Sequence, residues 1–180
     1  MRKPFLSLAI IVFAFVLTTV GCQQEDLPPA KTGIVEATDA YLKHYGVPPQ
    51  GKAGRAYAAV GYLPAKVNPA KIGPLPIFLF TEENQLEKVL KKLVSGELIT
   101  SDKQIYDDPF PDDLEIHTKP IQGGVLSLDL VTSQNWAVES QRAGVVALME
   151  TALQFNDVQS VKVALNGAPL DWIPDAGYQQ

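Results

Sequence analysis

Apolar and polar residues alternate with a period of two in two neighbouring segments of the chain. In "LEIHTK", residues 114–119, and "GVLSLDLV", residues 124–131, every second residue is apolar or weakly polar. This period is typical of a β-strand with one buried and one wet face. "PIQGG", residues 120–124, joins the two segments. The pattern therefore predicts an antiparallel hairpin.

Two other segments have the helical period. In "TEENQLEKVLKKLVSG", residues 81–96, one helix face carries the apolar side chains Leu86, Val89, Leu90, Leu93 and Val94. We expect Thr81 to cap this helix and Gly96 to end it. A second helix is predicted over residues 136–155, where Val145, Leu148, Met149, Ala152 and Phe155 share a side.

Three further strands are predicted from short apolar runs. They lie in "RAYAAVGYL" (55–63), in "LPIFLF" (75–80), which we expect to be covered on both faces, and at Val161, Val163 and Leu165. Asn166-Gly167 predicts a type I′ turn into a short return strand. The three prolines of residues 64–74 predict a loop, and residues 97–112 read as a polar loop.

The predicted order is therefore β-β-α-β-β-α-β. Helices set against a mostly antiparallel sheet indicate the α+β class, a two-layer sandwich with two helices on one face. The other sheet face would be wet or available to a partner.

The N-terminal segment has the layout of an export signal. Arg2 and Lys3 precede a run of about 13 largely apolar residues, which suits a signal peptide better than the roughly 20 residues of a spanning helix. "TVGC", residues 19–22, resembles a bacterial lipobox, although Thr19 stands where Leu is preferred. Cys22 is the only cysteine and has no disulfide partner. We expect residues 1–21 to be a lipoprotein signal peptide and Cys22 to carry the lipid; an uncleaved anchor is the alternative.

Both readings place the rest of the chain outside the cytoplasm, tethered to the cell membrane. Residues 1–21 hold two of the 15 basic and none of the 20 acidic residues, so the remainder has a formal charge of −7. Such a domain is a poor nucleic-acid binder, because phosphate contacts need clustered Lys and Arg. We predict a spacer over residues 22–53, with a helix within residues 33–46 left open, and one domain over residues 54–180.

Three stretches carry a resemblance to a known family. They are "LEKVLKKLVSG" (86–96), "GGVLSLDLV" (123–131) and "AGVVALMETALQFNDVQSVKVALNGAPLD" (143–171). Together they resemble the GerMN domain of sporulation and spore-germination lipoproteins, over about residues 55–173. The best-known members resemble two such domains in tandem, whereas this length fits one. The resemblance implies a non-catalytic interaction module that helps to assemble or position a cell-envelope complex.

Candidate chemistry is sparse in the sequence. His44 falls in the predicted spacer and His117 on the outward face of a strand, neither with a second histidine at metal-ligand spacing. "GKAGR", residues 51–55, lacks the Ser or Thr of a phosphate loop. Asp107, Asp108, Asp112 and Asp113 lack the spaced Gly of a calcium loop. We therefore predict no catalytic residue, no cofactor and no metal.

Two function hypotheses of different class remain. The first is the interaction module, with envelope or sporulation proteins as partners and Trp136 and Trp172 as possible interface residues, since aromatic side chains dominate interface energetics. The alternative is a lipoprotein that binds a small ligand or a cell-wall fragment. An apolar pocket would favour the alternative, whereas an exposed strand edge would favour assembly.

Overall fold

The computed structural model describes residues 36–48, 57–80, 83–99, 105–173 and 177. The predicted signal peptide and Cys22 lie outside these residues. The elements in chain order are β1 (Glu36–Ala37), α1 (Asp39–Tyr45), β2 (Tyr57–Ala65), β3 (Asn68–Leu79), α2 (Gln85–Val94), the 3₁₀ turn η1 (Glu97–Ile99), β4 (Glu115–Gln122), β5 (Val125–Val131), α3 (Val138–Ala152), β6 (Ser160–Leu165) and β7 (Ala168–Pro169). No helix of the described part is long and apolar enough to cross a membrane.

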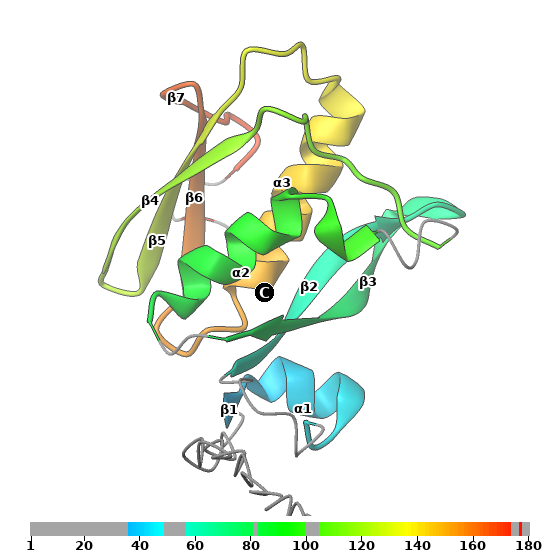
Figure 1. Cartoon of the computed structure of the whole chain (residues 1–180). Coiled ribbons are helices and arrows are strands. Elements are labelled where there is room, and N and C mark those ends of the chain that lie inside the picture. The colour runs from blue at the N-terminus through cyan, green and yellow to red at the C-terminus, as the bar shows by residue number, and fades with distance from the viewer. Residues whose placement is uncertain (1–35, 49–56, 81–82, 100–104, 174–176, 178–180) are drawn as a thin grey trace, which may run out of the picture.

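The α+β class and the order from β2 to β6 confirm the sequence prediction. The strands nevertheless form two sheets, of orders β1-β2-β3 and β4-β5-β6-β7, as Figure 1 shows. The pair β5–β6 is parallel rather than antiparallel. This follows from the connection, because the crossover through α3 returns the chain to the end of the sheet from which β5 started.

The prediction of a loop over residues 64–74 is wrong. β2 and β3 form one long hairpin in which Pro64 lies opposite Ile72 and Pro74 opposite Tyr62. Only Lys66 and Val67 connect the two strands. Proline lacks a backbone N–H and is tolerated in a sheet where that group would point away from the neighbouring strand. The prolines therefore mark a sheet edge here, not a loop.

Helices α2 and α3 pack between the two sheets around one core (Figure 1). The predicted apolar stripe of α2 is confirmed at Val89, Leu90 and Leu93, which are fully buried. The helix starts at Gln85, after Asn84 with φ of 52°, and not at Thr81. Gly96 follows the helix with φ of 70°, a conformation that glycine adopts without strain.

Residues 36–48, assigned above to the spacer, are packed on the β2–β3 hairpin. β1 pairs parallel to β2, and α1 answers the open question of a helix in this region. The Thr38 side chain accepts a hydrogen bond from the N–H of Tyr41 at 3.1 Å and so caps α1. Tyr41 is buried against Ala58 and Val60, so the outer face of β2 is covered as well. The prediction that residues 75–80 are covered on both faces is wrong, because Pro76 and Phe80 are exposed and only Phe78 is half-buried on that face.

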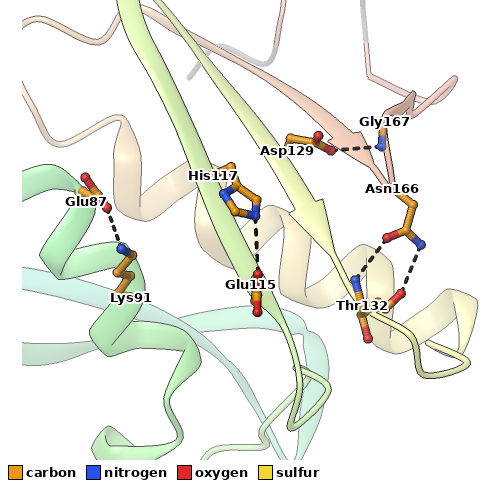
Figure 2. Close-up of polar contacts among 8 residues, drawn as sticks. All are labelled: Glu87, Lys91, Glu115, His117, Asp129, Thr132, Asn166 and Gly167. Atoms are coloured by element: carbon orange, nitrogen blue, oxygen red, sulfur yellow. Dashed lines mark hydrogen bonds and ion pairs between the residues drawn. The ribbon is translucent and has the colours of Figure 1, made fainter.

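Two tight turns close the second sheet. Gly123 and Gly124 join β4 to β5, both with positive φ. Asn166 (φ 51°) and Gly167 (φ 79°) form the predicted turn into β7. The Asn166 side chain also accepts from the N–H of Thr132 at 3.1 Å and donates to its carbonyl at 3.2 Å (Figure 2). This amide ties the end of β5 to the end of β6.

Candidate protein-binding groove

The outer edge of β2 is closed by hydrogen bonds along its length. The carbonyl of Ala58 accepts from the N–H of Thr38 at 3.0 Å, next to β1. Further along, Val60 bonds to the Gln154 side chain, and the Tyr62 N–H donates to Thr151 Oγ1 at 3.0 Å. Beyond them, the N–H of Asp107 donates to the Pro64 carbonyl at 3.0 Å. Side chains of α3 and of the turn after it, Thr151 and Gln154, thus take the place of a neighbouring strand.

The outer edge of β3 is closed differently. On β2, the backbone N–H and C=O groups of the even-numbered residues point away from β3. Because these residues pair with even-numbered residues of β3, the backbone groups of the latter also point away from the hairpin. Two of these residues, Pro74 and Pro76, have no N–H to offer. The Pro74 carbonyl accepts from the hydroxyl of Tyr45 at 2.7 Å. Prolines at such positions protect an edge from further pairing.

Among the residues that the structure describes, strand β4 is the edge of the second sheet and pairs with β5 alone. On β5, the carbonyl of Leu130 accepts from the N–H of Asn166 on the β6 side. The backbone N–H and C=O groups of the odd-numbered residues of β5 therefore point toward β4. Their partners on β4 are odd-numbered as well. The backbone N–H and C=O groups of Ile116 and Thr118 therefore point away from the sheet.

These outward groups face a groove of about 510 Å³ between β4 and α2. Its walls are Glu87, Lys91, Val94, Ser95, Asp112, Leu114, Glu115, Ile116, His117 and Thr118. The volume lies in the range of ligand sites. A helix on one side and an unpaired strand edge on the other is the arrangement by which some peptide-binding domains accept an extended segment.

The groove is acidic. On α2, Lys91 Nζ lies 2.6 Å from Glu87 Oε1, and these two side chains compensate each other (Figure 2). On β4, His117 Nε2 lies 3.5 Å from Glu115 Oε2, with both side chains largely exposed (Figure 2). Asp112 adds a third carboxylate. With histidine counted as neutral, the lining has a formal charge of −2.

Asp113 fixes the chain just before β4. Its carboxylate accepts from the Thr132 hydroxyl, from the Ser133 hydroxyl at 2.6 Å and from the Ser133 N–H at 2.9 Å. These bonds, the one from the Ser133 side chain first, lower the pKa of Asp113 from 3.8 to about 2. The charged side chain thus ties the entry of β4 to the exit of β5.

The aspartates considered for calcium do not gather into a site. Asp113 faces Ser133, whereas Asp108 accepts from the N–H of Phe110 at 3.1 Å. Burial, more than the nearby Asp112, raises the pKa of Asp108. Within the described ranges no group of three or more His, Cys, Asp or Glu side chains is placed to hold a metal ion.

The two tryptophans lie in different surroundings. Trp136 is buried, its Nε1 donates to the Pro109 carbonyl at 2.7 Å, and its ring packs beside Phe110. Trp172 is half-buried, with the Arg142 guanidinium 6.0 Å from its ring centroid. The structure thus places Trp136 in the core, while an interface role for Trp172 stays a prediction. Neither residue lines the groove.

The remaining candidates are also separate from one another. His44 on α1 lies 3.3 Å from the Tyr62 hydroxyl, outside the groove, whereas His117 lines it on the exposed side of β4 as predicted. Residues 51–55 and Cys22 lie outside the described residues. Sequence reasoning missed the outward backbone of Ile116 and Thr118, because strand order decides which strand is an edge.

Comparison with known proteins agrees with this fold. The family model described as Germane, sporulation and spore germination, matches residues 60–171. The first GerMN domain of the sporulation protein GerM from Bacillus subtilis superposes with a TM-score of 0.54 at 21% identity, over 68% of this chain and 92% of that domain. Against the tandem GerMN domains of the same protein, the score and identity are the same, and the match spans 44% of that chain.

A search of curated proteins finds no match. The resemblance to the GerMN domain is confirmed, since the family model covers more than half of the chain and the solved GerMN structures share its fold. This chain therefore belongs to the Germane family of sporulation and spore germination.

Proposed function

We propose that this protein is a lipid-anchored, non-catalytic interaction module that helps to assemble or position a cell-envelope complex during sporulation or germination. The observation that carries the proposal is the open edge of β4 beside α2. Exposed strand edges pair readily with other chains, and proteins usually protect them. Here β2 and β3 are protected and β4 is left beside a groove, which favours a binding role for it.

The N-terminal sequence supports the membrane part of the proposal. Cys22 follows a signal-like segment, and a diacylglycerol anchor would hold the domain at the membrane, since two acyl chains give stable attachment. The family supports the cellular process, because its model is described by sporulation and spore germination.

The test is chemical crosslinking in the cells that make the protein, followed by mass spectrometry of the adducts. The proposal predicts that the same few envelope proteins recur, and that they disappear with Cys22→Ala, which mislocalises the chain. Adducts with no recurring protein, together with a small molecule or wall fragment retained by the purified protein, would contradict the proposal and favour a ligand-binding lipoprotein.

A further inference from the structure

We propose that the groove between β4 and α2 binds an extended, basic segment of a partner protein, which adds to the sheet as a strand beside β4. This inference rests on the proposed function and names the kind of partner that its surface accepts. It follows from the backbone geometry of β4, from the helix that bounds the groove, and from the charge of the lining.

The backbone of β4 supplies the hydrogen bonds. Ile116 and Thr118 each present one N–H donor and one C=O acceptor outward. An incoming strand can pair with all four groups. The groove runs from Leu114, directly before β4, to Thr118, about 14 Å at the usual rise of a strand, which suits four or five residues.

Pro120 limits the site at one end. It follows the outward positions Ile116 and Thr118, has no N–H, and lies where the β4–β5 register shifts between Lys119 and Gln122. At the other end, the N–H of Leu114 donates to the Pro111 carbonyl at 3.1 Å. The pairing stretch is therefore short and defined, as expected for the capture of a short segment.

The position of α2 favours a peptide over a second copy of this chain as the occupant of the groove. Glu87, Lys91 and Val94 of α2, with Ser95 directly after it, form the wall that faces β4. In a symmetric pair of β4 strands, each copy would bring its own α2 against the other. A single extended segment needs room for one strand only.

The charge of the lining selects a basic segment. Glu87 is paired with Lys91, the only lysine or arginine among the lining residues. No such residue of the lining is left to pair with Asp112 or Glu115. Alternate side chains of an added strand point to the same face, so Lys or Arg at every second position would meet them.

Binding of synthetic peptides to the full chain in detergent tests the inference. The probes are fluorescein-labelled Lys-Val-Lys-Val-Lys-Val-Lys and its acidic match, Glu-Val-Glu-Val-Glu-Val-Glu, measured by fluorescence anisotropy. Hydrogen exchange then locates the contact. We expect the basic peptide to bind at least about tenfold more tightly, a difference of about 1.4 kcal/mol, and to protect the amides of Ile116 and Thr118.

Two sets of variants separate backbone pairing from charge. Thr118→Pro removes an outward N–H that the β4–β5 pair does not use, and should weaken binding at least tenfold, whereas Thr118→Val keeps the N–H and should bind normally. The double change Asp112→Lys with Glu115→Lys alters exposed side chains only and should reverse the peptide preference, even if Thr118→Pro does not fold.

Equal binding of both peptides, no binding, or protection away from β4 would overturn the inference. A dimer in sedimentation equilibrium that Thr118→Pro dissociates would also overturn it, and would assign the edge to a second copy. If the same envelope proteins are still crosslinked in cells despite any of these results, the proposed function stands. Only the inference that a basic segment pairs with β4 is then wrong.

Discussion

Gln154 binds both backbone groups of Val60. Its Oε1 accepts from the Val60 N–H at 2.8 Å, and its Nε2 donates to the Val60 carbonyl at 2.6 Å. The same side chain accepts from the Thr38 hydroxyl at 2.8 Å. One glutamine on the loop after α3 therefore closes the edge of β2 at Val60 and holds the start of α1.

Gln154→Glu should loosen α1. Glutamate places a second oxygen where Nε2 now donates to the carbonyls of Val60 and Thr151, and the repulsion between these oxygens should displace the side chain from the Thr38 hydroxyl as well. We expect a loss of about 1–3 kcal/mol in the free energy of unfolding. Hydrogen exchange of residues 38–45 should speed up markedly, while exchange in β4–β6 stays unchanged.

Thr151→Val should destabilise the fold without changing its shape. Thr151 is fully buried, and valine would leave the Tyr62 N–H without its acceptor. The expected loss is about 1–3 kcal/mol in urea unfolding. Thr151→Ser, which retains the hydroxyl and removes only the methyl group, should lose less; a loss with Thr151→Ser as large as with Thr151→Val would contradict the dominant role given to the hydrogen bond.

Gly144→Ala should disturb the packing of Trp136. A Cβ at this position would lie 2.8 Å from Cζ2 of Trp136 and 3.0 Å from Cε1 of Phe110. We expect a loss of about 1–3 kcal/mol and a change in tryptophan fluorescence. The control Ser140→Ala changes an exposed residue of α3 and should stay within about 0.5 kcal/mol of the parent.

Asp113 should make the fold sensitive to acid. Its folded pKa of about 2 lies below the ordinary 3.8, so the charged form is favoured by folding. The stabilisation is complete above pH 4 and is lost as the pH falls from about 4 to about 2. Asp113→Asn should flatten the stability curve over this window, which urea unfolding at a series of pH values measures; an unchanged slope would contradict the prediction.

Local sequence patterns predicted the helices and strands better than they predicted which strands lie side by side. The alternation in residues 124–131 correctly places Leu126, Leu128 and Leu130 in the core, and the Asn166-Gly167 turn is where its chemistry requires. These features depend on each strand's own residues. They are readable without knowing the rest of the fold.

The errors concern segments whose structure depends on a sheet edge or on contacts with residues far away in the sequence. Pro74 looks like a loop residue, yet it lies in β3 because its missing N–H group would point outward. Residues 36–48 read as a spacer because α1 is short and depends on contacts with Gln154 and β2. The open edge at Ile116 and Thr118 depends on strand order, which no local pattern encodes.

The most direct test of the binding surface is photo-crosslinking in the cells that make the protein. A photoreactive residue at His117, which is 61% exposed in the groove, is compared with one at Val138, which is 65% exposed at the start of α3 and outside the groove. We predict a discrete partner adduct from position 117 and none from position 138. The same adducts from both positions, or an adduct from position 138 alone, would contradict the assignment of the groove as the binding surface.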